Sequence, residues 1–234
     1  MTIISIITPW LNGLHLLPDY ARAVEGANQV IIVDNGSEPV TAQGLREYAN
    51  ASGATVIRND TNLGFAFANN QGYAAATGEI VIFLNSDVAI EAPWLDLVRR
   101  DVQPGALSGP SLQRQLVYGM WLPYVEGWCI AGRRAAWEAL NYWPTPLAFN
   151  DGPWDAAAYP GPYWEDNDLC LRALESGLNL AQTAWPVRHK GGQSAGALVN
   201  HGATFEANRA TFKQRARALW ERKTAPARLE GVTW

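Results

Sequence analysis

The chain has 234 residues, 48% of them hydrophobic and 17% charged, and its formal net charge at pH 7 is −4. That length suffices for one α/β domain with a substantial core, and the absence of net positive charge argues against nucleic acid or an anionic membrane as a partner. The 2 cysteines, Cys129 and Cys170, have no second Cys or His at metal-ligand spacing, which argues against a zinc site and a disulfide framework.

The first part of the chain alternates between short apolar runs and segments of helical periodicity. The runs are bounded by turn residues and are predicted to be strands at residues 3–8, 29–33, 54–58 and 79–84. Helices are predicted at residues 15–26, 41–52 and 65–76. This alternation predicts an α/β fold with a mostly parallel central sheet flanked by helices, whose ligands bind beyond the carboxyl ends of the strands.

The regular alternation stops between residues 105 and 162, where Pro, Gly and many of the 11 tryptophans are concentrated. We expect few strands or helices there, and interpret the stretch as a lid or substrate-side subregion whose aromatic rings either pack a core or form ligand platforms. A helix is predicted from Asp166, with Gly177 as its C-cap. A strand at residues 183–187 and a final helix at 203–223, with a solvated outer face, are predicted to follow.

Two polar motifs directly follow predicted strands. Asp34, with Asn35-Gly36-Ser37 after it, presents a carboxylate on a tight turn; it could accept hydrogen bonds from a base or ribose, or only cap the turn. Asp87 ends the motif Asn85-Ser86-Asp87. Its carboxylate is the type of ligand that Mg²⁺ or Mn²⁺ takes beside a diphosphate.

Two further motifs lie in the second half of the chain. Glu165 and Asp166 stand at a predicted helix start, where a carboxylate can act as general base on a hydroxyl or simply interact with the helix dipole. His189 precedes Lys190-Gly191-Gly192 and follows an apparent strand. Its imidazole could complete a metal shell or be structural.

Taken in this order, the four motifs resemble family 2 glycosyltransferases of the GT-A fold, in the version familiar from rhamnosyltransferase-like members. Residues 5–12 are similar to the opening strand and Pro-x-Tyr-Asn loop, with Leu11 where Tyr is usual. Residues 33–37 match the nucleotide-binding Val-Asp-Asn-Gly-Ser motif, and residues 62–72 resemble the segment under the nucleotide. The donor-binding residues that this resemblance implies are Pro9, Trp10, Asn12, Asp34, Asn35, Asn62, Gly64, Phe65, Asn69, Asn85 and Ser86.

The same resemblance implies catalytic and metal-binding roles. Residues 165–172 are similar to the family's Glu-Asp-x-Asp-Leu-x-x-Arg block, whose second acid, here Asp166, is the base. Residues 85–87 stand in place of Asp-x-Asp with an amide as the first member, so Asp87 is the charged metal ligand, joined by His189. The implied cofactor is Mn²⁺ or Mg²⁺.

The acceptor side departs from the family pattern. The family commonly has a short connection ahead of the catalytic block, whereas this chain carries Trp143, Pro144, Pro146, Trp154, Pro160 and Pro162. The acceptor-binding candidates are Trp128, Trp154, Trp164 and Glu165.

These assignments predict an inverting glycosyltransferase that moves a sugar from a nucleoside-diphosphate sugar, with dTDP-rhamnose the first donor considered, to a saccharide or glycoconjugate hydroxyl. One domain is expected over residues 1–234, with a nucleotide-sugar-binding half at 1–104, an acceptor-binding and catalytic half at 105–200, and a C-terminal helix and tail at 201–234. The alternative is a catalytically silent saccharide-binding module of the same fold. A sugar nucleotidyltransferase would need a Gly-rich, basic loop after the first strand, which residues 9–13 lack.

The sequence shows no basic leader, and no apolar run approaches the roughly 18 residues of a membrane-spanning helix. We therefore expect a cytoplasmic protein that is peripheral to the membrane through its acceptor.

Overall fold

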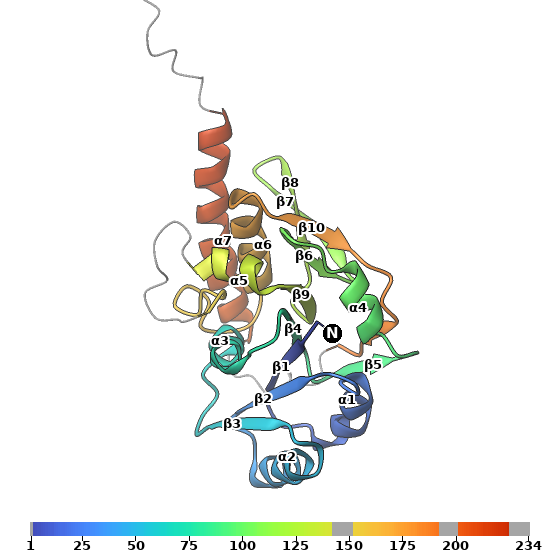
Figure 1. Cartoon of the computed structure of the whole chain (residues 1–234). Coiled ribbons are helices and arrows are strands. Elements are labelled where there is room, and N and C mark those ends of the chain that lie inside the picture. Colours follow the sequence, from blue (N-terminus) through green and yellow to red (C-terminus); the bar gives the residue numbers. More distant parts are fainter. Residues whose placement is uncertain (1, 142–151, 192–200, 225–234) are drawn as a thin grey trace, which may run out of the picture.

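A seven-stranded mixed sheet forms the centre of the computed structural model, which describes residues 2–141, 152–191 and 201–224 (Figure 1). The strand order is β10-β6-β9-β4-β1-β2-β3, and only β9 runs antiparallel to its neighbours. The strands of this sheet are β1 (Ile4–Trp10), β2 (Gln29–Asn35), β3 (Thr55–Asn59), β4 (Ile80–Leu84), β6 (Ala106–Gly109), β9 (Cys129–Arg133) and β10 (Asn179–Gln182). This confirms the predicted α/β fold with a mostly parallel central sheet.

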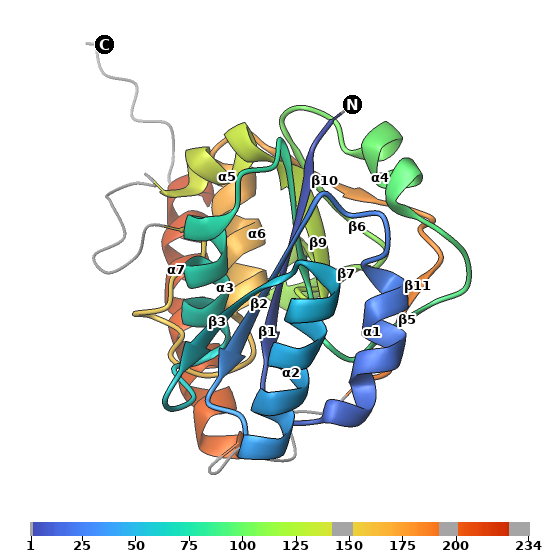
Figure 2. The same ribbon diagram turned by 60° about the horizontal axis from the view of Figure 1, so that its bottom comes forward.

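Helices cover both faces of the sheet, and each face has its own core cluster (Figure 2). One face packs against η1 (Leu14–Leu16), α1 (Leu17–Ala23), α2 (Pro39–Ser52) and α4 (Leu95–Asp101). The other packs against α3 (Phe65–Ala75), α5 (Arg134–Asn141) and α6 (Glu165–Glu175), and α7 (His201–Thr224) lies outside α6. Cys129 and Cys170 are free thiols and are buried in this packing.

The parallel strands at the centre fix the place of the functional residues. Because β1 pairs in parallel with β2 and β4, and β2 with β3, their carboxyl ends lie along one edge of the sheet. Trp10, Asn35 and Leu84 end three of these strands. The loops predicted to bind ligand therefore meet at a single edge.

The described residues between 105 and 162 are more regular than the sequence predicts. They hold β6, β9 and α5, and a two-stranded hairpin of β7 (Leu112–Val117) and β8 (Met120–Val125). Tyr118 and Gly119 connect the hairpin with φ of 49° and 76°, the left-handed pair that suits a tight two-residue turn. β9 pairs with β4, a strand more than 40 residues earlier in the chain. A local pattern of apolar residues does not reveal such a long-range pairing. The predicted departures Trp143, Pro144 and Pro146 lie outside the described residues.

The prediction of a strand at residues 183–187 is wrong. The chain instead forms β10 and then β11 (Val187–His189), which pairs antiparallel with β5 (Val88–Ile90). Between them Trp185 turns into the core, where its ring contacts Trp94 and its Nε1 donates to Asp101 Oδ2 at 3.1 Å. The final helix begins at His201 and buries Phe212, Ala216 and Leu219 on one face, with the other face solvated as predicted. Within the described ranges, none of the helices combines the length and apolarity needed to cross a bilayer.

Candidate active site

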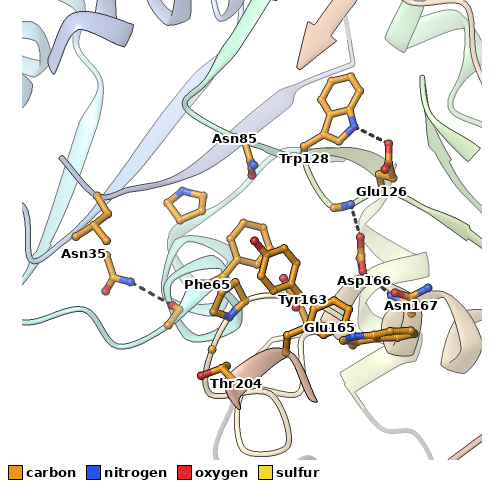
Figure 3. Close-up of a pocket in the computed structure, with 18 of the residues that line it drawn as sticks. Asn35, Phe65, Asn85, Glu126, Trp128, Tyr163, Glu165, Asp166, Asn167 and Thr204 are labelled. Carbon is orange, nitrogen blue, oxygen red and sulfur yellow. Dashed lines mark hydrogen bonds between the residues drawn. The ribbon is translucent and has the colours of Figure 1, made fainter. Parts of the chain in front are cut away.

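A cavity of about 630 Å³ opens at the carboxyl edge of the sheet (Figure 3). Its walls come from the ends of β1, β2 and β4, the β7–β8 hairpin, the start of α6, β11 and the first turn of α7. Most of the predicted site residues line it: Pro9, Trp10, Asn35, Asn62, Gly64, Phe65, Asn85, Ser86, Asp87, Trp128, Trp164, Glu165, Asp166 and His189. One cavity therefore joins the four sequence motifs.

Asn35 organises the end of the cavity next to β2. Its Nδ2 donates to Asn62 Oδ1 at 2.7 Å and to the Gly64 carbonyl at 3.2 Å, while its Oδ1 accepts from the Leu63 backbone N–H at 3.1 Å. These bonds tie the 62–64 loop to the end of β2. Gly64 has φ of 94°, a conformation that favours glycine, and the loop leads directly into α3.

Asp34 lies beneath this surface, not on it. It is 1% exposed, its Oδ1 accepts from the Ser37 backbone N–H at 2.9 Å, and its Oδ2 pairs with the Arg58 guanidinium. Asn12, at φ 57°, makes two similar bonds. Its backbone N–H donates to Ser37 Oγ at 2.9 Å, and its Oδ1 accepts from the Glu38 backbone N–H at 2.8 Å. Asn69 is fully buried and donates to the Phe65 carbonyl. In the part of the chain that the structure describes, these three residues support the cavity without lining it.

The structure does not support Trp154 as an acceptor-binding residue. Its side chain is 0% exposed, and its ring meets Phe65 and Phe83 edge-on at 5.4 and 5.3 Å between centroids. No face of this ring is open to a sugar, because both contacts belong to the core under the sheet. Trp154 is therefore a core residue.

A polar cluster suited to a cation lies at the ends of β4 and β11. His189 Nε2 is 3.0 Å from Asp87 Oδ1 and 3.4 Å from Asn85 Nδ2. Asn85 Oδ1 is buried and finds no hydrogen-bond partner among the described residues. No group of three or more His, Cys, Asp or Glu converges in the described ranges, so an amide oxygen, a carboxylate and an imidazole are the donor set available. This set fits a divalent ion such as Mn²⁺ that takes its remaining ligands from a diphosphate.

Trp128 connects this cluster with the other end of the cavity. Its ring stacks on His189 at 5.2 Å between centroids and 5° between planes. Its Nε1 donates to Glu126 Oε2 at 3.1 Å, and the same oxygen accepts from Ser111 Oγ. Glu126 was not predicted as a site residue, because the turn between β8 and β9 has no motif that marks it.

Asp166 lines the cavity from the first turn of α6, where its side chain is half-buried. Its Oδ2 accepts from the Gly127 backbone N–H at 3.0 Å and its Oδ1 from the Asn167 N–H at 2.8 Å (Figure 3). Burial raises the pKa of this carboxyl to about 6, against the lowering effect of the two N–H groups and with a further rise from the Glu126 charge. Burial and the charge of Asp166 raise the pKa of neighbouring Glu165 well above its usual value.

The remaining wall contains residues that the sequence motifs missed. Tyr124 and Gln115 come from the β7–β8 hairpin, and Tyr163 from the turn before α6. Thr204 and Phe205 come from α7, and the Phe205 ring contacts those of Tyr163 and Trp164 at 5.5 and 5.6 Å. The helical spacing of apolar residues predicts that Phe205 lies on the buried face of its helix. It does not predict which segment of the chain Phe205 contacts. Gly192, which ends the run after His189 in the fourth motif, lies outside the described residues.

Comparisons with known proteins agree with this geometry. The family model described as "Glycosyl transferase family 2" matches residues 5–151. An uncharacterized protein of Sinorhizobium fredii is 32% identical over 92% of this chain and 26% of its own length. A PGL/p-HBAD biosynthesis glycosyltransferase of Mycobacterium bovis is 34% identical over 49% of this chain and 45% of its own length. The chain thus spans about a quarter to a half of these relatives.

A solved structure shares the fold. The mannosyltransferase PcManGT from Pyrobaculum calidifontis, in complex with GDP-Man and Mn²⁺, superimposes with a TM-score of 0.59 at 17% sequence identity. The match covers 97% of this chain and 76% of that one. At this identity the likeness concerns the fold.

Proposed function

This chain belongs to glycosyl transferase family 2 and has the GT-A fold, and we propose that it is a glycosyltransferase that transfers a sugar with inversion, using Asp166 as the general base. The donor is a nucleoside-diphosphate sugar and the acceptor a hydroxyl of a saccharide or glycoconjugate. Asp166 takes the proton of that hydroxyl as its oxygen attacks the anomeric carbon from the face opposite the diphosphate.

The observation that carries this proposal is the setting of the Asp166 carboxylate. It lines the same cavity as Asn85 and Asp87, at the start of α6, where a donor and an acceptor would meet. A pKa of about 6 leaves this carboxylate mostly ionised at neutral pH and more basic than an ordinary aspartate. Both properties suit a group that must accept a proton from an alcohol.

A divalent cation is part of the proposal. Asp87, His189 and the Asn85 amide would hold Mn²⁺ or Mg²⁺, which supplies positive charge to stabilise the departing diphosphate. The related fold bound to GDP-Man and Mn²⁺ supports this use of metal. Pro9, Asn35, Asn62 and Phe65 would surround the nucleotide, with the fully buried Trp10 ring packed beneath them against Tyr20. The first donor to test is dTDP-rhamnose.

We place acceptor binding at the aromatic residues that line the cavity near Asp166. Trp128, Trp164 and Glu165 stay as acceptor-binding candidates because they line the cavity near Asp166. Among the acceptor classes open to such an enzyme, a lipid-linked hydroxyl is the first to test. A cytoplasmic protein, peripheral to the membrane through such an acceptor, would be consistent with that choice.

The experiment begins with a thermal-shift screen of UDP, GDP and dTDP with Mn²⁺, because a ligand that binds only the folded state raises the midpoint. The matching sugar donors are then assayed for transfer to a panel of octyl glycosides. Asp166→Asn should lose about 100-fold or more in rate and keep nucleotide binding, whereas exposed Asp60→Asn should match the wild type. Near-normal turnover by Asp166→Asn would remove the base assignment. A protein that binds a nucleotide but consumes no donor would instead be the silent saccharide-binding module.

A further inference from the structure

The turn that precedes α6 has an unusual backbone. Tyr163 and Trp164 have φ of 78° and 72°, and both belong to the left-handed region that bulky residues rarely adopt. Such conformations persist only where the surroundings determine them fully. Residues 163–167 also line the cavity without interruption, so the turn sets where Glu165 and Asp166 lie.

Asn208 of α7 holds this turn. Its side chain is 2% exposed, and its Nδ2 donates to the carbonyls of Gly161, Pro162 and Tyr163 at 3.2, 3.1 and 3.0 Å. One amide group thus binds three successive carbonyls of a segment 45 to 47 positions earlier in the chain. Residues 161–163 lie outside any helix or strand, so their carbonyls have no place in a regular ladder and the amide donates to them instead.

The same face of α7 packs against the rings of the turn. Phe205, one turn before Asn208, contacts Tyr163 and Trp164, and Phe212, one turn after it, stacks on Trp164 at 5.4 Å and 29°. These positions follow one another at helical spacing. One helix therefore supplies both the rings that pack against Tyr163 and Trp164 and the Asn208 amide that holds the backbone of the turn.

Close backbone approaches enclose the turn on both sides. A Cβ on Gly161 would come 2.4 Å from Thr204 Cγ2, and a Cβ on Gly64 would come 2.3 Å from the Pro160 carbonyl oxygen. The turn is thus wedged between the start of α3, on the donor side, and the start of α7. It can move little as long as α7 stays in place.

We propose that Asn208 is a positioning residue for the acceptor side, which fixes the 160–164 turn and thereby the direction in which Trp164, Glu165 and Asp166 face the cavity. The inference rests on the proposed function for its catalytic consequence. It also assigns α7, which lies beyond the family match at residues 5–151, to the active site. Asn208 itself does not line the cavity within the described chain, so it acts through the turn.

The test compares Asn208→Asp, which keeps the size but loses the N–H donors, with Gln214→Ala, which removes an exposed amide from the same helix. Amide hydrogen exchange should become about tenfold faster at residues 161–167 in Asn208→Asp and stay unchanged in β1, β2 and β4. Transfer to the octyl glycoside used by the wild type should fall about 10- to 100-fold, while the Kd for the nucleoside diphosphate with Mn²⁺ stays constant. Gln214→Ala should change neither property.

Asn208→Ser, which keeps a shorter donor, serves if the aspartate variant does not fold, and it should show the same pattern in weaker form. Faster exchange throughout the protein with an unchanged acceptor KM would mean a merely structural role and overturn the proposal. Unchanged exchange at 161–167 would overturn it as well. Absence of any donor consumption by the wild type would instead overturn the proposed function, and with it the catalytic consequence drawn for Asn208.

Discussion

His189 Nε2 lies 3.0 Å from Asp87 Oδ1, although 102 positions separate the two residues in the chain. The antiparallel pairing of β11 with β5 sets His189 opposite Val88, and the Lys190 backbone N–H donates to the Asp87 carbonyl at 2.8 Å. Backbone bonds therefore hold the imidazole and the carboxylate together before any ligand binds. Such a preformed pair needs little rearrangement to accept a cation.

His189→Ala and Asp87→Asn should each weaken Mn²⁺-dependent binding of a nucleoside diphosphate by at least about tenfold, because each removes a ligand from a small donor set. Titration of Mn²⁺ into EDTA-treated, dialysed protein with UDP, GDP or dTDP, followed by thermal shift, measures the change. Arg188→Ala is the matched control on the same strand, since its side chain is 69% exposed in a surface pair with Glu91. Equal responses of all three variants, or full activity after EDTA, would exclude the proposed metal site.

The rate should depend on the ionisation of Asp166. Because a general base must be unprotonated and the pKa of this carboxyl is about 6, kcat/KM should fall about tenfold per pH unit below that value. Above it the profile should level off as Asp166 becomes fully ionised. A pH–rate profile between about pH 5 and 8 measures this, with Asp60→Asn as the control. A flat profile across that interval would contradict the role of Asp166.

Asp166 should also reduce the stability of the folded protein at neutral pH. Its folded pKa of about 6 lies above the ordinary 3.8, so the protonated form is favoured by folding, and this contribution is lost as pH rises through 6. Asp166→Asn removes the ionisation and should raise the free energy of unfolding by about 1–2 kcal/mol more at pH 8 than at pH 4. Urea unfolding at both pH values tests this. An identical difference at the two values would show that burial does not disfavour the charge.

Local sequence patterns predicted well which residues gather at the carboxyl edge of the sheet. Asn35 and Asn85 follow strands of a parallel sheet, and parallel strands bring their carboxyl ends to one edge whatever the register. Trp154 shows where this reasoning stops, because a tryptophan in an aromatic stretch can face a cavity or a core, and only packing decides. Glu126 and Thr204 have no local pattern at all. They reach the cavity through the β7–β8 hairpin and α7, whose placement depends on contacts between distant segments.

Gly64→Ala should destabilise the protein more than Gly53→Ala. Both glycines have positive φ, 94° and 78°, but ψ is 160° at Gly64, a region essentially restricted to glycine, and 9° at Gly53, where a side chain costs about 1 kcal/mol. A Cβ at Gly64 would also lie 2.3 Å from the Pro160 carbonyl oxygen, whereas one at Gly53 meets nothing within 4 Å. We expect Gly64→Ala to cost about 1–3 kcal/mol more than Gly53→Ala in urea unfolding. Equal costs would mean that the 160–164 turn is free to move.

The buried pair Asp168–Arg172 should matter far more than an exposed pair of the same spacing. Both side chains are 0% exposed, Arg172 Nε donates to Asp168 Oδ2 at 2.8 Å, and Arg215 Nη1 donates to Asp168 Oδ1 at 2.6 Å. Asp168→Asn leaves the Arg172 charge buried without its counter-ion, for which we expect a loss of about 3–5 kcal/mol in the free energy of unfolding.

The Arg217–Glu221 pair on α7 has the same i,i+4 spacing with side chains 64% and 54% exposed, and water screens it. Glu221→Gln should therefore leave the urea midpoint unchanged. Because Asp168 also joins α6 to α7 through Arg215, its substitution should in addition speed amide exchange at residues 161–167, as Asn208→Asp does. Exchange that rises in one variant and not in the other would show that the two contacts hold α7 independently.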